Sequence, residues 1–214
     1  MKPLNQYIKE KLIINKDYRD NMIVVNSFDE LRKIIEDRYD KLEAGTKRKP
    51  IDFNDIDVSN IISFCDNDDN GLFEGTQFKY IDISDWDVSN VTDMEVMFNG
   101  CYELESVGDL SYWDVSNVTN MAYMFTDCVN FNQNISRWNV SRVTDMSYMF
   151  YDCASFNKDL SSWDVSKVKD MNAMFKFCKS FNQDISNWDV SEVRQHVYMF
   201  EGCPIKEEYK PKFK

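Results

Sequence analysis

The sequence is poor in the residues on which most catalytic and metal sites depend. It holds one histidine in 214 residues, and its six cysteines include no pair in the Cys-x-x-Cys spacing. Structural zinc sites need four such ligands at characteristic spacings, so the ligand number argues against a zinc ion. Ser-His-Asp, Walker and dinucleotide-binding fingerprints are also missing. These absences favour a protein that is not an enzyme and has no cofactor.

Long apolar runs are missing as well. No window approaches the roughly 18 consecutive apolar residues of a membrane-spanning helix. The start, MKPLNQYIKEKLIINKDY, lacks the apolar stretch and the small-residue cleavage site of a secretory signal. We therefore expect a protein that stays inside a cell or particle and keeps its cysteines as free thiols.

Positive charge is scarce beyond the N-terminal region. Of the net charge of −12, residues 1–50 contribute +3, from 12 basic and 9 acidic residues, which leaves −15 for the rest of the chain. An acidic surface repels phosphate backbones and disfavours nucleic acid as a partner. The short basic run from Thr46 to Pro50 is expected to be a solvated loop.

What the sequence has in abundance is repetition. The segment WDVSNVTDMEVMFNGC and four variants of it each begin at a tryptophan, namely Trp86, Trp113, Trp138, Trp163 and Trp188. These tryptophans are 27, 25, 25 and 25 residues apart. An atypical copy precedes them, with Ile56 in place of Trp and a five-residue insertion near Asp66 to Asn70. Such a period predicts a linear stack of six repeats.

Each repeat combines two hydrophobic periods. Around Trp163 and Val165 apolar residues alternate, which predicts a short strand, whereas from Val168 onward they recur every three or four residues, which predicts one or two helical turns. The start L-x-x-W-x-V matches a leucine-rich repeat with Trp in the middle slot. The expected fold class is an α/β repeat solenoid, a leucine-rich-repeat-like stack of short parallel strands and short helices.

The polar and apolar positions of the repeat have separate predicted roles. One unit alone cannot bury its apolar face, so neighbours should stack at about the 4.8 Å strand spacing, with Trp, Met, Phe and Cys as core ladders. Thr92 and Asp93, with their counterparts in later repeats, stand where they can accept hydrogen bonds from the first amides of the helical part.

The repeats are expected to occupy residues 51–205. Residues 1–50 form an N-terminal amphipathic helix and a β-α cap, and residues 206–214 form a charged tail after Pro204 that shields the last edge.

The cap has its own local signals. Asn21 to Val25 is a strand candidate, and Ser27 to Glu30 is a capping box that opens a helix continuing to Leu42 and closed by Gly45. Together with the strand expected at Ile56 to Val58, these elements predict a right-handed crossover that covers the first repeat.

The string WDVSNVTDM, followed by Met-Phe, Cys and Phe-Asn, closely resembles the 25-residue repeat of BspA-like leucine-rich-repeat proteins, which include bacterial surface proteins, mycoplasma lipoproteins and gut-phage proteins. The resemblance covers roughly residues 51–205. It implies an interaction protein that binds a protein or glycan partner through its sheet face.

The first dozen residues, MKPLNQYIKEKL, are similar to short amphipathic helices that open many tailed-phage proteins, with Leu4, Tyr7, Ile8 and Leu12 on the apolar side. This resemblance implies an alternative role as a structural or cargo protein of a phage particle, docked by its N-terminal helix. An ordinary docking or capping helix fits the same periodicity. The expected location is the cytoplasm or a phage particle.

The candidate binding residues flank the repeated tryptophan. If Trp and Val face inward, their neighbours face outward. The position after Trp is almost always Asp, which marks scaffold, whereas the position before it varies and is the candidate partner-binding row: Asp85, Tyr112, Arg137, Ser162 and Asn187. A solvated face that binds nothing fits the same pattern.

Two further features have more than one interpretation. Asp66, Asp68, Asn70 and Glu74 have calcium-loop spacing, but the twelfth loop position lacks the bidentate Glu, so a polar insertion loop is the favoured interpretation. His196 replaces the first Met of its repeat and is interpreted as a variant core or edge residue.

Overall fold

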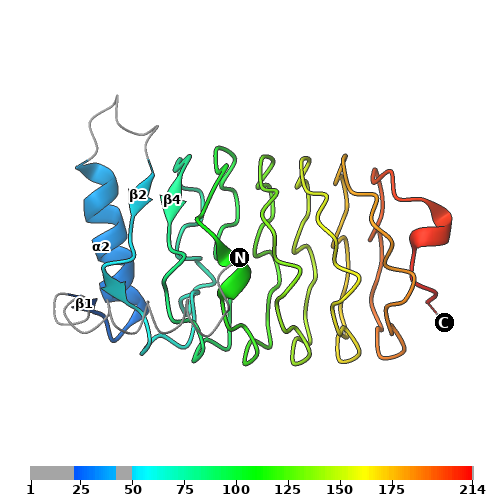
Figure 1. Cartoon of the computed structure of the whole chain (residues 1–214), viewed down its shortest axis with the longest axis horizontal. Coiled ribbons are helices and arrows are strands. Elements are labelled where there is room, and N and C mark those ends of the chain that lie inside the picture. Colours follow the sequence, from blue (N-terminus) through cyan, green and yellow to red (C-terminus); the bar gives the residue numbers. More distant parts are fainter. Residues whose placement is uncertain (1–21, 42–49, 214) are drawn as a thin grey trace, which may run out of the picture.

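The computed structural model describes residues 22–41 and 50–213. In Figure 1 the chain forms a row of narrow coils that lie side by side along one axis, with helix α2 at one end and the C-terminal segment at the other. The coils contain short parallel strands, isolated parallel bridges and many turns. The chain is therefore a repeat protein with few helices.

The N-terminal end of the row is covered by strand β1 (Ile23–Val24) and helix α2 (Phe28–Asp40). β1 pairs in parallel with β3 (Ile56–Asp57), as the sequence predicts. Ser27 caps α2 by accepting a hydrogen bond from the Glu30 amide at 3.2 Å. The Glu30 carboxylate accepts from the amide of the residue before the cap, at 2.8 Å. The Ser27 half of the predicted capping box is therefore confirmed, and the returning bond of Glu30 reaches Asn26 in place of Ser27.

The end of this helix differs from the prediction. α2 ends at Asp40, before the predicted last residue Leu42, and both Leu42 and the proposed closing Gly45 lie outside the described residues. Its inward side buries Leu31 and Ile35 against the first coil. A second parallel pair, β2 (Ile51–Asp52) with β4 (Ile81–Asp82), is absent from the predictions.

Two other predicted features lie outside the described residues. They are the amphipathic helix marked by Leu4, Tyr7, Ile8 and Leu12, and the basic run that begins at Thr46. None of the helices in the described part of the chain combines the length and the apolarity that crossing a membrane requires.

The predicted core ladders are confirmed. Phe98 and Phe125 stack with ring centroids 5.4 Å apart, and the same column runs through every coil: Phe73, Phe98, Phe125, Phe150, Phe175 and Phe200. The tryptophans form a second column, in which each indole N–H donates to a carbonyl of the preceding coil, as Trp138 does to Leu110 at 2.9 Å. Buried aromatic faces and satisfied indole donors together hold neighbouring coils in register.

The predicted helical turns of the repeats are wrong, because residues 50–213 contain no α-helix. In their place the Met–Phe–Cys segment is a chain of short turns. The Met97 amide donates to the Met94 carbonyl and the Cys101 amide to the Phe98 carbonyl. Turn residues between them have positive φ, as at Val96 (51°) and Gly100 (70°). Turns that advance three or four residues give the same apolar spacing as a helix.

Alternate amides in this segment bind the next coil. The amides of Met94, Val96, Phe98 and Gly100 donate to carbonyls of the following coil at 2.9–3.0 Å. The pattern repeats from coil to coil, so hydrogen bonds that a helix would make internally connect neighbouring repeats. The turns are therefore favoured over a helix. They satisfy the same backbone amides, and their hydrogen bonds also join one coil to the next.

The predicted Trp-x-Val strands are also wrong beyond the first coil. Most of the isolated parallel bridges instead join one row of residues, each five positions before the phenylalanine of the stacked column: Asp93, Asn120, Asp145, Asp170 and Gln195. Around Trp86 the backbone bonds locally, since the Trp86 amide donates to Ile83 and the Val91 amide to Val88. The segment remains extended enough to alternate inward and outward side chains, but its amides are already used in turns.

The expected capping role of the Thr-Asp pair is half confirmed. Asp93 accepts a hydrogen bond from the Glu95 amide at 3.0 Å. Thr119 instead donates, from both its amide and its hydroxyl, to the Thr92 carbonyl of the preceding coil. The bond from the amide does not depend on the side chain. Lys169 and Arg194 therefore make the same backbone bond to the preceding coil at this position.

The cysteines form a buried column of free thiols. Each of the five repeated cysteines donates its thiol to a carbonyl of the preceding coil, as Cys153 does to Phe125 at 2.9 Å. Burial raises the pKa of the Cys128, Cys153 and Cys178 thiols well above the ordinary value. These thiols are packing groups with little thiolate character.

We predict that the native protein protects these thiols from the reagent DTNB at pH 8. Cys128, Cys153 and Cys178 are fully buried and have raised pKa values, so they should react only after unfolding, whereas the partly exposed Cys203 should react first. Absorbance measured with and without denaturant, with peptide mapping of the modified sites, checks this order. Rapid modification of Cys153 in the folded protein would contradict it.

The C-terminal segment packs over the last coil. Its short 3-10 helix η2 (Glu207–Tyr209) brings the Tyr209 carbonyl to the Ile185 amide at 3.0 Å. The Phe213 ring stacks on His196 with centroids 4.0 Å apart. His196 is exposed at the edge of the stack, as one of the two sequence interpretations proposed. A further 3-10 helix, η1 (Leu110–Tyr112), lies directly before Trp113, where the next coil has a turn at Ser136 and Arg137.

Candidate binding surface

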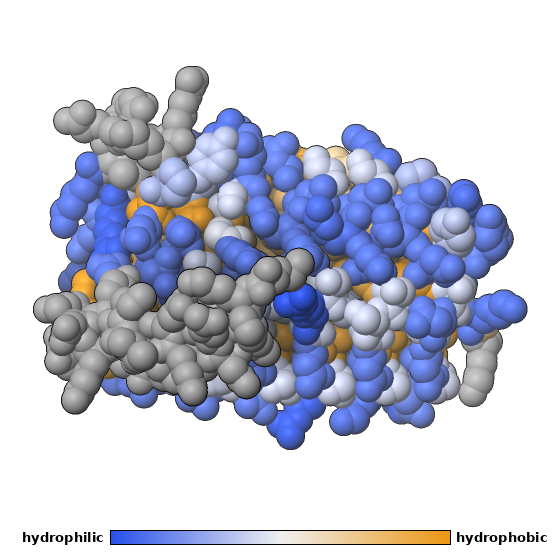
Figure 2. Space-filling model, viewed as in Figure 1, coloured by the Kyte–Doolittle hydropathy of each residue, from blue (hydrophilic) through white to orange (hydrophobic). Residues whose placement is uncertain are grey.

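The residues that flank the repeated tryptophan lie on one exposed wall of the stack. Trp138 is buried, while Arg137 before it and Asn139 after it are exposed, and the other full repeats show the same alternation. Because the coils are stacked in register, each flanking position forms a row across them. On the face seen in Figure 2, hydrophilic side chains cover most of the surface and apolar atoms show between them.

The constant acidic row after Trp holds the backbone. Asp87 accepts from the amide and the hydroxyl of Ser89, at 3.1 and 2.6 Å. The same Asp-x-Ser or Asn-x-Ser turn recurs in each coil. Hydrogen bonds from Ser166 hold the pKa of Asp164 below its ordinary value. The side chains of this row act as turn acceptors, which explains why the position is almost constant.

The variable row before Trp divides into two groups. Ser162 donates to the Ser136 carbonyl at 2.8 Å, and Asn187 donates to the Ser161 carbonyl at 2.8 Å, so both tie their coil to the preceding one. Asp85 is anchored through its backbone amide, which donates to the Asn54 side chain at 2.8 Å. The side chains of Ser162 and Asn187 therefore bind within the stack, whereas the bond of Asp85 comes from its backbone.

Tyr112 and Arg137 form the other group. The Arg137 guanidinium carbon lies 6.0 Å from the centre of the Tyr112 ring, a cation–π contact between neighbouring coils. The Tyr112 side chain remains 54% exposed. The structure thus brings together a large exposed aromatic ring and a guanidinium, two groups that are enriched in interface hot spots.

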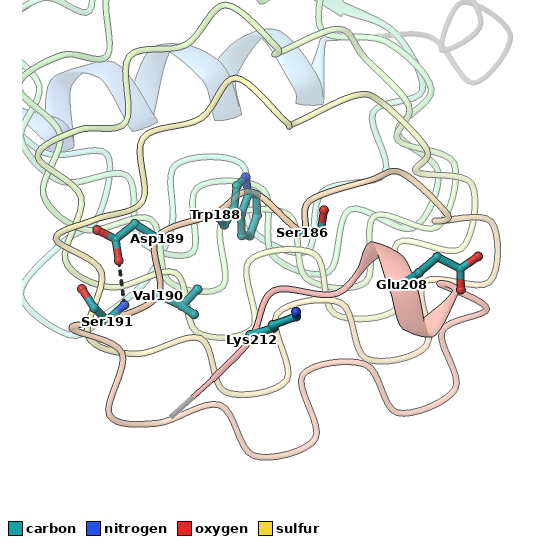
Figure 3. A pocket seen from close by; sticks show the side chains of 7 residues that line it. All are labelled: Ser186, Trp188, Asp189, Val190, Ser191, Glu208 and Lys212. Atoms are coloured by element: carbon teal, nitrogen blue, oxygen red, sulfur yellow. Dashed lines mark hydrogen bonds between the residues drawn. The ribbon is translucent and has the colours of Figure 1, made fainter.

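Two shallow polar pockets lie at the C-terminal end of this wall. The first, of about 330 Å³, is lined by Asp159, Ser161, Gln183, Asp184, Ser186 and Asn187. The second, of about 430 Å³, is shown in Figure 3 and is lined by Ser186, Trp188, Asp189, Val190, Ser191, Glu208 and Lys212. Both offer mixed hydrogen-bond donors and acceptors.

Neither pocket was predicted from the sequence. The recurring Asp-Ile-Ser and Asp-Leu-Ser segments that line them could have indicated the pockets. Each forms an Asx turn, such as the one in which the Ser186 amide donates to the Asp184 carboxylate at 3.0 Å. Glu208 and Lys212 had no such signal, since only the folding of the C-terminal segment brings them to this wall.

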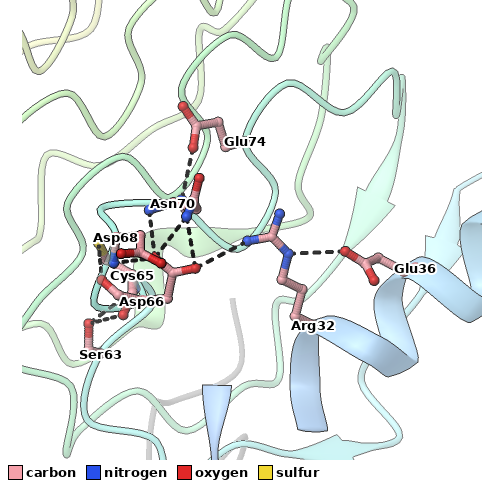
Figure 4. A network of polar contacts seen from close by, with 9 residues as sticks. Arg32, Glu36, Ser63, Cys65, Asp66, Asp68, Asn70 and Glu74 are labelled. Carbon is pink, nitrogen blue, oxygen red and sulfur yellow. Dashed lines mark hydrogen bonds and ion pairs between the residues drawn. The ribbon is translucent and has the colours of Figure 1, made fainter. Parts of the chain in front are cut away.

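The acidic insertion at Asp66 to Asn70 is stabilised by hydrogen bonds among its own residues. An antiparallel bridge between Cys65 and Gly71 closes the loop. Figure 4 shows Asp66 accepting from the amides of Asp68 and Asn70, at 2.8 and 2.9 Å, with the Arg32 guanidinium 3.7 Å away.

Glu74 does not join Asp66 in a common ligand set. Its carboxylate accepts from the Gly71 amide at 3.0 Å and from the Asn99 side chain at 2.7 Å. Within residues 22–41 and 50–213 no group of three His, Cys, Asp or Glu side chains is placed to hold a metal ion. The four calcium-loop candidates instead supply the hydrogen bonds of a polar loop.

The stacked coils and their one-sided rows define the chain as a repeat protein. Residues 44–138, 67–175 and 102–210 each match the family described as "Mycoplasma protein of unknown function, DUF285". These overlapping matches span most of the chain, which therefore belongs to this family. Comparisons with curated proteins and with solved structures gave no match.

Proposed function

We propose that this chain is a non-enzymatic interaction protein, a leucine-rich-repeat-like solenoid of the BspA-like kind that binds a protein or glycan partner. The proposed binding wall is the variable row before the tryptophans, centred on Tyr112 and Arg137. One observation carries the proposal: these two groups contact each other on an exposed wall, whereas Ser162 and Asn187 of the same row bond to the preceding coil.

The rigidity of the wall supports this role. The Tyr112 and Arg137 backbones each precede a tryptophan that is at most 5% exposed. Trp113 and Trp138 stack with their centroids 6.3 Å apart. A partner therefore meets side chains on a preorganised surface, which lowers the entropic cost of binding.

The environment of the aspartates in the repeated Asp-x-Ser turns supports the non-enzymatic part of the proposal. Acid–base catalysis needs carboxylates with separated pKa values. Asp159, Asp164 and Asp184 each have a pKa below the ordinary range, for the same reason: each accepts hydrogen bonds from the serine two residues on. Equivalent groups in equivalent turns supply neither a distinct acid nor a distinct base.

We predict that a Tyr112→Ala, Arg137→Ala variant will fold normally and lose most of its partner affinity. Both side chains are exposed and sit outside the core, so the stability should change by no more than about 0.5 kcal/mol. Truncating two hot-spot groups should weaken binding at least about 30-fold. A partner identified by pull-down from the source cells, or a ligand found on a glycan array, provides the probe for titration calorimetry.

A Tyr198→Ala, Arg194→Ala variant is the matched control. It removes the same two residue types from exposed positions on a different wall. The proposal expects the control to bind like the unmodified protein. If the control abolished binding and the Tyr112, Arg137 variant did not, the binding wall would be misassigned.

A further inference from the structure

A second wall of the stack carries a strip of tyrosines. We define the tyrosine strip as Tyr102, Tyr123, Tyr148 and Tyr151 with the carboxylates of Asp127 and Asp152. The Tyr123 and Tyr148 rings stack with centroids 4.6 Å apart, and Tyr151 lies 5.9 Å from Tyr148. Tyr102 donates to the Asp127 carboxylate at 3.3 Å. The strip thus extends continuously across three neighbouring coils.

The fold does not require tyrosine at these positions. The slot of Tyr123 and Tyr148 is occupied by Val96 one coil earlier and by Ala173 one coil later, all with φ between 50° and 57°. Left-handed backbone disfavours a bulky side chain, so Ala suits this slot at least as well as Tyr. Tyr102 is 56% exposed, and the other three rings are half-buried. Grouped rings that reach the surface and that the core does not need mark interaction surfaces.

One tyrosine at the equivalent position, Tyr198, does not belong to the strip. Tyr198 occupies the same position in the last coil, and the sequence suggests that it packs against Tyr123 and Tyr148. That expectation is wrong for Tyr198, because Ala173 intervenes, and Tyr198 is 63% exposed.

Next to Tyr198 the chain supplies a cation of its own. The Lys176 ammonium lies 4.7 Å from the centre of the Tyr198 ring and 5.0 Å from that of Phe177, and it pairs with the Glu201 carboxylate at 3.2 Å. Two aromatic rings and a carboxylate here hold one amine. The tyrosine strip also presents aromatic rings and carboxylates, but among the described residues no lysine occupies the position that Lys176 has beside Tyr198.

The carboxylates of the strip take part in no ion pair with any residue that the structure describes. Neither Asp127 nor Asp152 is a partner in the ion pairs of residues 22–41 and 50–213. Burial raises the pKa of Asp127 and the charge of Asp152 adds to this, because both disfavour the ionised carboxylate, whereas the hydrogen bond from Tyr102 acts in the opposite direction. A bound cation would relieve this repulsion.

We propose that the tyrosine strip binds a lysine- or arginine-bearing segment of a partner protein. Cationic side chains would lie over the tyrosine rings and meet Asp127 and Asp152. Charge complementarity selects this occupant, since nucleic acid and anionic membrane surfaces would both be repelled by an acidic wall. The strip lies on a different wall from Tyr112 and Arg137, so this proposal is independent of the proposed function.

The probe for the test is a fluorescein-labelled peptide of alternating Lys and Ser, with a Glu-Ser peptide for comparison. Fluorescence anisotropy with the full chain should show saturable binding of the Lys-Ser peptide, weakened by added salt because screening reduces charge attraction. Tyr148→Ala leaves the net charge unchanged and copies the natural Ala173. It should weaken binding about threefold to tenfold through loss of a cation–π contact.

An Asp127→Asn, Asp152→Asn variant should weaken binding about tenfold or more. Its control is Asp159→Asn, Asp184→Asn, which removes the same charge from another wall and keeps the turn acceptor, as Asn134 does in its own coil. The control should stay within about twofold of the unmodified protein.

Three results would overturn the proposal: no saturable binding of the Lys-Ser peptide, equal losses in the two Asp variants, or Tyr148→Ala binding like the unmodified protein. The Tyr112→Ala, Arg137→Ala variant should bind the Lys-Ser peptide normally, which keeps this outcome separate from that of the other wall.

Discussion

Trp138→Ala is expected to lower the free energy of unfolding by about 3–5 kcal/mol, the range for removing a large aromatic side chain from a core. The indole is 3% exposed, and its ring lies 6.3 Å from that of Trp113 and 6.4 Å from that of Phe125. Its N–H donates to the Leu110 carbonyl at 2.9 Å, so the variant also loses a buried hydrogen bond, although that carbonyl keeps the bond from the Trp113 amide at 3.1 Å. Chemical denaturation followed by circular dichroism measures the loss.

Trp138→Phe is the matched control for this prediction. It keeps an aromatic ring but removes the indole donor, so it should cost about 1–3 kcal/mol. In a stack of repeats each coil is stabilised by its neighbours, and the alanine variant should therefore loosen both adjoining interfaces. A loss below about 1 kcal/mol for Trp138→Ala would show that the tryptophan column is not part of the core.

Gly71→Ala is expected to destabilise the protein by about 3 kcal/mol, at the upper end of the usual range for overpacking. A methyl group at Gly71 would collide with the backbone carbonyl of Val96 in the following coil. That backbone cannot move aside cheaply, because the Val96 amide is bonded to Ala122 and the Met97 carbonyl accepts from Phe73. The glycine is thus required by close approach of two chains.

Gly75→Ala separates this effect from backbone strain. Gly75 has φ of +64°, but an added methyl group there would have no atom within 4 Å. The same column holds Asp127, Asp152 and Phe177 at positive φ, so alanine should cost only about 1 kcal/mol. Thermal unfolding of both variants gives the comparison. Equal losses would show that the Val96 contact is not what makes Gly71 necessary.

The sequence predicted the cap well because its signals are local. Ser27 and Glu30 lie three residues apart, and their hydrogen bonds need only the first turn of α2. The pairing of β2 with β4 could not be predicted in this way. Ile51 and Ile81 are brought together by the stacking of coils, and neither short segment has a pattern that names its partner.

The candidate wall was predicted in position but not in detail. The alternation around Trp138 places Arg137 outward whether the segment is a strand or an extended turn. The sequence did not show that Ser162 and Asn187 would bond to the preceding coil while Tyr112 and Arg137 face each other. Those contacts join residues about 25 positions apart and depend on the stacking register.

By itself, the sequence determined that the chain stacks repeats and which side chains enter the core, because burial follows the pattern of apolar residues. Only the tertiary structure decided the backbone of the repeats. A spacing of three or four residues, as from Met94 to Phe98 and Cys101, is shared by a helix and by a chain of turns. The chain of turns forms because alternate amides of this segment donate to carbonyls of the next coil. A single repeat does not contain these acceptors, so its sequence alone cannot show which backbone forms.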